Sequence, residues 1–444
     1  MGTGTIRKGN YVLLATKKYA SEYSREYTKE YVDEYAAQKG DEVDKDEIVS
    51  EAVDEAVAKT KERIQKSISS LDPASSSIEE VINALQGIYQ DAKYFTVTFA
   101  DETGDGAGSV KVKQDTYVEK PQDPTADRDI FDGWYLGDAT TAFDFEGTPI
   151  TGDITLTARW TPAVASVTVG DKRTLYATLN GASQAAVADG VSEATITILR
   201  DQEVPGARGG FAIIGKGYDK TKVTVVNDYT VDFSGVVTTQ NDLRCIAIDG
   251  ATVTFEGTGT WRRTLGTHSM CTVGEAVDAN KTWLGTVTTE EKAYAVVTIN
   301  GGTFLHDGTD SYIGQAHVWN VQNGVLTVDG GVVSQQRVYS TKYCIRTETS
   351  EVGACKAAGK CVINGGEFRM LSSAEASRAI VCAKAGSLEI TSDGSPCFIG
   401  GSSASREAMK SYLAEGTTFV EDCENKYVYK STSFCRYTVG PDPS

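Results

Sequence analysis

Several residue types and patterns are scarce in this chain of 444 residues. Proline occurs nine times against 44 glycines, and no segment approaches the 18 consecutive apolar residues of a membrane-spanning helix. The first ten residues contain no apolar signal-peptide core. Scarce proline, combined with abundant glycine, threonine and valine, is typical of a β-rich protein with many tight turns.

Basic residues are outnumbered: 43 Lys and Arg face 61 Asp and Glu, a net charge of −18. Such a surface repels a phosphate backbone, which argues against a nucleic-acid partner. The three histidines, His268, His306 and His317, do not have zinc-ligand spacing, and no Cys-x-x-Cys motif occurs. We therefore expect no metal and no other cofactor.

The cysteines are absent from the first half of the chain and odd in number. Buried reduced thiols inside a β-structure are the favoured interpretation, and a disulfide framework is the alternative. The sequence does not decide whether any pair is bonded. The nine are Cys245, Cys271, Cys344, Cys355, Cys361, Cys382, Cys397, Cys423 and Cys435.

Residues 1–94 are predicted to form an anchoring peptide followed by a helical, coiled-coil stalk. Tyrosines repeat every four residues, close to one helical turn, and a second apolar stripe follows at mixed three and four spacing. Such helices cannot bury their stripes alone, so we expect self-association, with packing of the helices on one another as the alternative. The residues concerned are Tyr19, Tyr23, Tyr27, Tyr31, Tyr35, Val53, Val57, Ile64 and Leu71.

Residues 95–162 contain aromatic, glycine and proline residues in a specific order. The strand-like segment 95–99 comes first, Phe-Asp-Gly-Trp-Tyr follows at 131–135, and a second alternating strand occupies 155–160. This resembles the internalin-type B-repeat, or Listeria–Bacteroides repeat. The resemblance implies a small β-grasp-like module with a display or adhesion role and no catalytic residues. The predicted core consists of Phe131, Trp134, Tyr135, Phe143, Phe145 and Trp160.

Residues 163–444 change to a repeated pattern of strand, glycine turn and strand. An alanine-rich, helix-like stretch ends near Ala188, and octets centred on Asp249, Asn300, Asp329 and Asn364 then share one pattern. The segment resembles a right-handed parallel β-helix with a capping entry. Coils of 25–30 residues would give about eight to ten rungs, with Asn300, Asp329 and Asn364 aligned as a turn ladder rather than a metal site. The fold class is mainly β.

Loops that leave such a helix are the usual place for function, and residues 264–292 and 338–360 are the longest. A glycosidase needs two carboxylates across a cleft, and exposed indoles bind sugars well. We expect no catalytic residues, with polysaccharide depolymerisation as the alternative. Candidate ligand-binding residues in this region are Trp261, Trp283, His306, Asp307, Asp310 and Trp319.

These features together predict an elongated, non-enzymatic protein of a phage particle, a head or tail fibre. A display module without an export signal can leave a cell by lysis as part of a virion. Expected partners are its own copies, as a homotrimer, a capsid or tail protein at the N-terminus, and a glycan or protein of the host surface or mucus. The alternatives are a bacterial cell-surface or secreted adhesin and a tailspike-type depolymerase.

Overall fold

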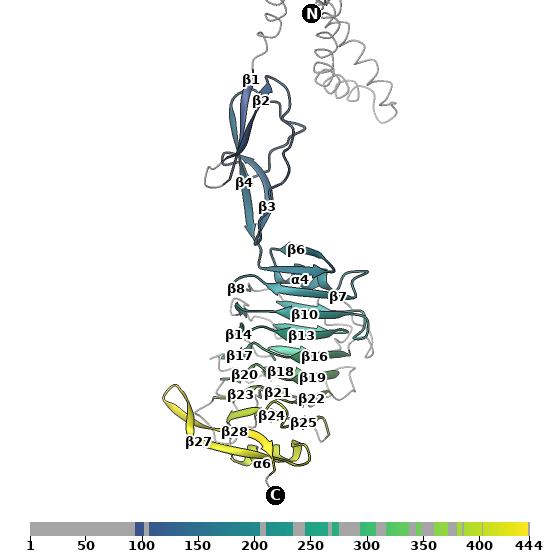
Figure 1. The fold of residues 1–444 in the computed structure, drawn as a ribbon, viewed down its shortest axis with the longest axis vertical. Helices are drawn as coiled ribbons and strands as arrows, with labels where there is room; N and C mark the ends of the chain where they lie inside the picture. Colours follow the sequence, from purple (N-terminus) through teal and green to yellow (C-terminus); the bar gives the residue numbers. More distant parts are fainter. Residues whose placement is uncertain are drawn as a thin grey trace, which may run out of the picture. The chain divides into compact units, whose positions relative to one another are not determined.

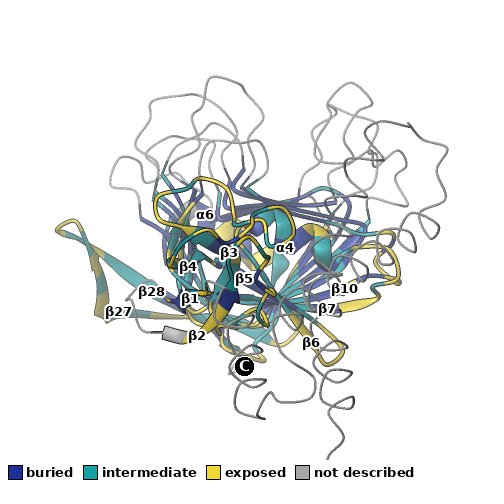
Figure 2. Ribbon diagram, turned by 90° about the horizontal axis from the view of Figure 1, so that it is seen from above, coloured by how far each residue is buried: buried dark blue, intermediate teal, exposed yellow. Residues whose placement is uncertain are grey.

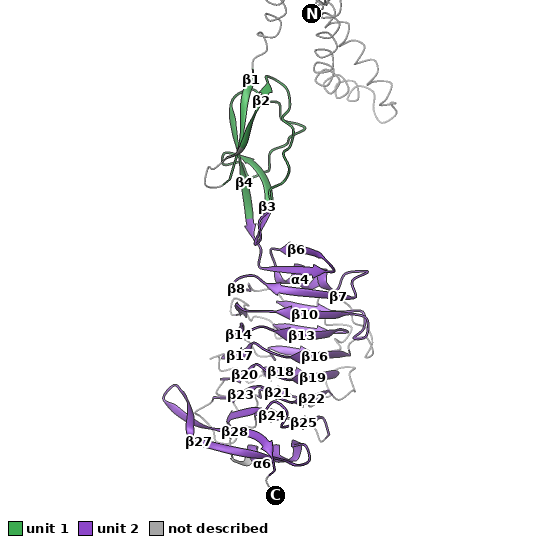
Figure 3. Cartoon of the chain, in the orientation of Figure 1, with its two compact units in different colours: residues 1–124, 131–160 green, residues 125–130, 161–444 purple. Residues whose placement is uncertain are grey.

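The computed structural model describes residues 94–101, 106–204, 210–233, 245–264, 269–274, 294–307, 317–336, 343–347, 359–371, 380–383, 386–401 and 403–442. The chain divides into two compact units (Figure 3). Unit 1 contains Phe131–Trp160 and the residues up to Pro124, and unit 2 contains Thr125–Ile130 and everything from Thr161. The predicted N-terminal stalk lies outside the described residues.

Unit 1 is a four-stranded mixed sheet in the order β2-β1-β4-β3 (Figure 1). The parallel pairing of β1 with β4 joins the first and last strands of the unit, and β2 is antiparallel to β1. Both strands predicted from alternation are therefore present. The four strands are β1 (Tyr94–Ala100), β2 (Gly106–Lys113), β3 (Asp129–Leu136) and β4 (Ile154–Pro162).

The core of unit 1 is built around Trp134. Its ring meets Phe99 edge-on at 5.0 Å and Phe131 at 5.6 Å between ring centroids. Phe143, Phe145 and Trp160 pack against the same cluster, as the sequence predicts. Tyr135 is different, because its ring lies under the guanidinium of Arg159, 4.2 Å away.

Unit 2 consists mainly of three sheets that the chain visits in turn, one strand of each per coil (Figure 1). Sheet 1 contains β25 (Leu388–Ile390), β22 (Lys360–Ile363), β19 (Gly324–Val328), β16 (Ala295–Ile299), β13 (Thr252–Glu256), β10 (Lys222–Val226), β7 (Glu193–Ile198), β5 (Ala165–Val169) and β6 (Lys172–Tyr176). Sheet 2 contains β27 (Thr417–Tyr429), β28 (Thr432–Pro441), β26 (Cys397–Gly400), β23 (Glu367–Met370), β20 (Val332–Gln335), β17 (Thr303–His306), β14 (Thr260–Arg263), β11 (Thr230–Asp232) and β8 (Gln202–Glu203). Sheet 3 contains β24 (Val381–Cys382), β21 (Ile345–Arg346), β18 (Trp319–Val321), β15 (Cys271–Val273), β12 (Ile246–Asp249) and β9 (Phe211–Ile214).

Strands of successive coils pair in parallel and in register. In sheet 1, Lys222 pairs with Glu193, which makes a coil of 29 residues. Thr252 pairs with Val296, 44 residues on, so one coil is much longer than the predicted 25–30. Among the described residues, sheet 1 contains seven parallel strands from β7 to β25, fewer than the eight to ten rungs expected.

The turn from sheet 1 to sheet 2 explains the Asn/Asp-Gly-Gly pattern. A Cβ on Gly330 would lie 2.4 Å from the carbonyl oxygen of Asn300 in the preceding coil. Gly331 has a φ of 76°, in the left-handed region that glycine tolerates best. The first glycine is therefore required by the close approach of two coils, and the second by its backbone conformation.

Two of the three residues predicted to form a turn ladder, Asp329 and Asn364, are in contact through their side chains. The side-chain amide of Asn364 donates to the Asp329 carboxylate at 2.8 Å, and the Thr391 hydroxyl donates to Asn364 at 3.0 Å. The octet around Asp249 is a different feature, and grouping it with the others was wrong. Asp249 ends β12 in sheet 3 and is buried, whereas Ile299, just before Asn300, pairs with Phe255 of sheet 1.

The interior of the three-sheet unit is continuous and mainly apolar. Inward positions alternate with outward ones along the strands of sheet 1, as the burial pattern of β16 shows, and buried residues gather in the middle (Figure 2). In sheet 3, consecutive residues are buried, as in β12 and β15. Along sheet 2 the inward row places Trp261 beside Phe304 in register, and Phe368 beside Phe398. Burial of each such aromatic contributes about 2–3 kcal/mol.

Non-parallel elements cover the ends of the stack. At its start, β5 runs antiparallel to β7, and the predicted helix is present as α4 (Leu179–Ala186), which buries Leu179, Ala182 and Ala186. At its finish, β28 runs antiparallel to β26 and continues a hairpin with β27. Helix α6 (Ser403–Met409) and the short η2 (Lys410–Tyr412) lie between β26 and β27 in the chain. Among the described residues, no helix is both long and apolar enough to cross a bilayer.

Candidate functional site

Two of the predicted ligand-binding tryptophans lie in the core. Trp261 and Trp319 are 1% and 0% exposed. Trp261 stacks on Phe211 and on Phe304, at 5.4 and 6.5 Å between centroids. Both occupy inward positions of their strands, so neither offers a ring face for a sugar. The expectation of exposed indole platforms is wrong for these two residues.

His306 is also buried, and for the same reason. Side chains two apart on a strand share a face, so His306 points inward with Phe304 on β17. In register it lies between Arg263 of the preceding coil and Gln335 of the next, and all three are buried. This polar row lies in the interior, so it is not exposed to a ligand in solution.

Asp307, one residue further on, lies in a charged cluster on the outer side of sheet 2. Its carboxylate is 3.2 Å from the guanidinium of Arg262, and that guanidinium also meets Asp232 at 3.5 Å. Arg262 points outward because its neighbours on β14, Trp261 and Arg263, are the buried ones. The three charged side chains come from successive coils, and the Arg262 side chain is 39% exposed.

A second group of polar side chains lies further along the same side. Arg369 on β23 is paired with Glu367, and its guanidinium lies 4.9 Å from the ring of Tyr427 in the terminal hairpin. The hydroxyl of Tyr429 donates to Gln336 at 2.6 Å. Hairpin β27–β28 therefore folds back over coils that precede it. We call Asp232, Arg262, Asp307, Glu367 and Arg369 the sheet 2 outer face.

The sheet 2 outer face offers hydrogen-bonding groups that ion pairs hold in place. Asp232 and Asp307 both contact the Arg262 guanidinium, so the three side chains form one charge-paired group. Planar guanidinium and carboxylate groups present donors and acceptors in defined directions. Such a surface offers donors and acceptors to a polar ligand.

The other predicted site residues lie outside the described part of the chain. Among the ligand-binding candidates these are Trp283 and Asp310, and none of the self-association residues between Tyr19 and Leu71 is described either. The expectation of two uninterrupted long loops is wrong, because strand β15 lies within 264–292 and strand β21 within 338–360. Residues 265–268, 275–293, 337–342 and 348–358 lie outside the described part of the chain. The two segments belong to the 44-residue coil and to the coil in which Lys360 pairs with Val325, 35 residues earlier.

Among the described residues, some cysteines are buried free thiols and two form a disulfide, so each of the two interpretations of the sequence applies to part of the set. Cys245, Cys271, Cys344 and Cys361 are free and buried, as expected for reduced core thiols. Burial raises the pKa of the Cys245 thiol to about 11, with nearby Arg263 opposing it, and that of Cys344 to about 12. These thiols are therefore protonated and inert at neutral pH.

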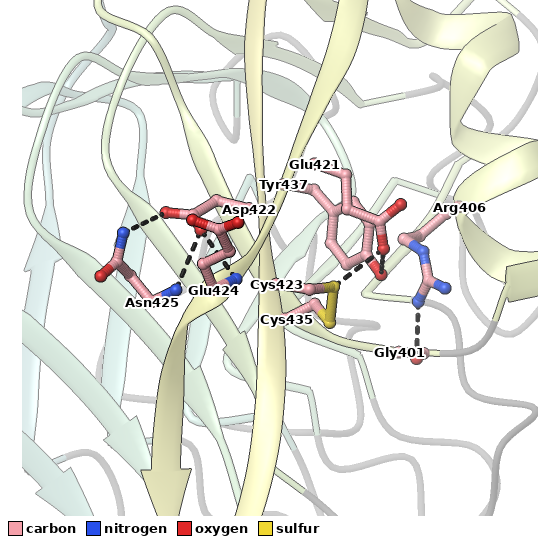
Figure 4. Close-up of a disulfide and its surroundings, with 9 residues drawn as sticks. All are labelled: Gly401, Arg406, Glu421, Asp422, Cys423, Glu424, Asn425, Cys435 and Tyr437. Carbon is pink, nitrogen blue, oxygen red and sulfur yellow. Dashed lines mark hydrogen bonds between the residues drawn. A yellow bond between two sulfur atoms is a disulfide. The ribbon is translucent and has the colours of Figure 1, made fainter.

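Cys423 and Cys435 form a disulfide across hairpin β27–β28, with Cα atoms 4.4 Å apart (Figure 4). It lies beside a β-bulge, where Asp422 is paired with Arg436 and Tyr427 with Phe434. Asp422 accepts hydrogen bonds from the backbone and side chain of Asn425, which lower the pKa of its carboxyl group. The bulge turn is thus held by a covalent bond and by local polar contacts.

The four-stranded sheet of unit 1 has a match among known families. Residues 95–159 match the Listeria–Bacteroides repeat domain. This confirms the resemblance for that segment, and it includes all of β3 and its buried Trp134. The match includes none of the strands of sheets 1 to 3. We refer to residues 95–159 as the repeat domain.

One relative among curated proteins comes from Evansella cellulosilytica, and its provisional name is that of a membrane protein. It is 28% identical over 159 residues, which are 31% of this chain and 22% of the relative. The chain thus matches about a fifth of that relative's length. No solved structure matches the chain.

Sequence reasoning missed the role of the terminal hairpin and four outer-face residues, Asp232, Arg262, Glu367 and Arg369. A signal for Arg262 was present, because this residue follows a buried tryptophan in an alternating strand and must face outward. The hairpin also had a signal, since residues 417–429 and 432–441 contain many Thr, Val, Phe and Tyr residues, which favour strands, on either side of Lys430 and Ser431. The pairing of Tyr429 with Gln336 had none.

Proposed function

We propose that the three-sheet unit is a right-handed parallel β-helix and that the chain is a non-catalytic fibre of a phage particle. It would bind glycans or proteins of a host surface or of mucus. The observation that carries the proposal is the sheet 2 outer face, where Asp232, Arg262 and Asp307 of three successive coils meet. Two coils further on, Arg369 lies beside Tyr427 of the hairpin. The repeat domain supports a display role, since the family is typical of surface proteins.

The binding part of the proposal rests on Arg262. Its guanidinium is held by Asp232 and Asp307 yet keeps 39% of the side chain exposed, so it can donate to an acidic or hydroxyl-rich glycan without reorganising. Successive parallel strands lie about 4.8 Å apart, so charged groups on three successive coils follow one another closely along the stack. An extended glycan chain suits such a surface.

Binding to an array of mucin and bacterial-surface glycans tests this part. Arg262→Ala is expected to weaken the strongest glycan signal about tenfold or more, because it removes one or two charge-assisted hydrogen bonds to the glycan. Lys222→Ala removes an equal charge from an exposed position on sheet 1 and is expected to change nothing. Equal binding by wild type and Arg262→Ala, with both folded by circular dichroism, would count against the outer face.

The particle part of the proposal has a separate test. Mass spectrometry of gradient-purified virions from a culture that produces this chain is expected to find it, and immunogold labelling should place it on head or tail. A chain found only in the cell envelope would overturn the fibre assignment.

A bacterial cell-surface adhesin is the second candidate. The relative from Evansella cellulosilytica carries a membrane-protein name, and the repeat domain fits display on a cell as well as on a virion. The same fractionation decides between the two, because an adhesin would be recovered with cell envelopes whether or not particles are present.

A further inference from the structure

The bulge of the terminal hairpin gathers sulfur and oxygen donors at one place. Between the pairs Asp422 with Arg436 and Tyr427 with Phe434, residues 423–426 of β27 face Cys435 alone. The extra residues turn away at the bulge, and Cys423 is left opposite Cys435. Both cysteines are half-buried, in contrast to the deeply buried thiols of the coils.

Glu421 supplies an oxygen on the same side. It lies two residues before Cys423 on β27, so their side chains share a face of the strand. One carboxylate oxygen of Glu421 is 3.0 Å from Sγ of Cys423, and this oxygen and the two sulfurs lie within 4.8 Å of one another (Figure 4). This set could converge on one ion.

The Glu421 carboxylate is oriented by its neighbours. The hydroxyl of Tyr437 donates to the same oxygen at 2.8 Å, and Arg406 of α6 lies 4.1 Å from the Tyr437 ring. Arg406 in turn donates to the carbonyl oxygen of Gly401 at 3.0 Å. Metal-ligating carboxylates commonly receive a hydrogen bond of this kind, which fixes their orientation.

We propose that Glu421, Cys423 and Cys435 form a redox-controlled zinc site in the terminal hairpin. In the disulfide form the sulfurs carry no thiolate and only one oxygen ligand is present, so zinc is not held. A dithiol reductant delivers two electrons and two protons to the S–S bond, giving two thiols and its own disulfide. Zinc then displaces both thiol protons and binds two thiolates and the carboxylate.

Zinc is the metal that these ligands select. Thiolates favour zinc over calcium and magnesium, and a carboxylate completes a mixed set with Zn–S near 2.3 Å and Zn–O near 2.1 Å. Three protein ligands leave a fourth tetrahedral position for water. The hairpin would then be closed by a disulfide in oxidising surroundings and by zinc in reducing ones.

Zinc titration of the full chain by calorimetry tests the proposal. The protein is reduced with dithiothreitol, freed of reductant under argon and titrated with zinc chloride, with the oxidised protein titrated in parallel. One zinc per chain is expected for the reduced protein alone, and cobalt in place of zinc should show thiolate-to-metal charge-transfer absorption. Glu421→Gln, which keeps the disulfide for folding, is expected to weaken binding about tenfold or more.

Cys423→Ser/Cys435→Ser provides the control for the other thiols of the chain. It is expected to bind no zinc after the same treatment, while the buried thiols remain in place. Equal zinc binding by this variant and by reduced wild type would overturn the proposal, as would reduced wild type that binds none. Neither outcome depends on whether the chain is a phage fibre.

Discussion

At the scale of single residues, burial decides most of what the side chains can do. The fold buries Trp261, His306 and Cys344, whereas Arg262 and Cys423 remain partly exposed. The sequence shows the residue type in each case. It does not show which of two strand faces is inward until one neighbour of known burial fixes the alternation.

The buried thiols predict how stability depends on pH. The folded pKa of Cys245 is about 11 against an ordinary value of 9.0, because burial disfavours the thiolate. The protonated form is thus favoured in the folded state, and its stabilising contribution is complete below pH 9 and lost as pH rises from 9 towards 11. Chemical unfolding across this window should show a shallower decline for Cys245→Ala than for wild type.

The difference between the two proteins isolates this thiol from tyrosines and lysines that titrate in the same range. At pH 7, Cys245→Ala should show only the constant cost of the missing sulfur. Parallel pH profiles for the two proteins between pH 8 and 11 would contradict the assignment.

At the scale of elements, the turn between sheets 1 and 2 is what the sequence predicts best. Its Asn/Asp-Gly-Gly signature is a local motif, and each of the two glycines is required by the local backbone. The motif alone therefore predicts the contact between Asp329 and Asn364. The octet at Asp249 has nearly the same local chemistry but occupies another corner. Only the register of Phe255 with Ile299, a non-local pairing, separates the two cases.

Gly365→Ala is expected to destabilise unit 2. The new Cβ would lie 2.2 Å from the carbonyl oxygen of Asp329, so two coils must move apart, at a cost of about 1–3 kcal/mol. Gly440→Ala in β28 is the matched control, because its Cβ would meet only Val420, at 3.5 Å. Thermal unfolding should show a lower midpoint for the first variant and little change for the second.

At the scale of the whole molecule, the mainly β class and the repeat domain are predicted from the sequence, and the number of coils is not. Coil length varies because insertions such as that in the 44-residue coil enlarge a corner without disturbing the strand register. A periodicity read along the chain therefore miscounts rungs. Particle attachment and ligand depend on partners, which no periodicity encodes.

The tyrosine stripe of the N-terminal region leads to a prediction for the full chain. Sedimentation equilibrium is expected to give three chain masses, because amphipathic helices bury their stripes only against other helices. Serine at Tyr23, Tyr27 and Tyr31 should shift the distribution to single chains, and serine at the exposed Tyr218 should not. A monomeric wild type at micromolar concentration would contradict the proposed homotrimer.

The covers at the two ends of the coil stack also restrain polymerisation. Parallel strands that pair in register could in principle accept another molecule and grow into a filament without limit. Here β5 reverses direction against β7, β28 does so against β26, and Leu413 bridges to Ile390 beyond the last coil of sheet 1. The parallel pairing thus stops at the first and last coils, so many copies can be crowded together without pairing their strands end to end.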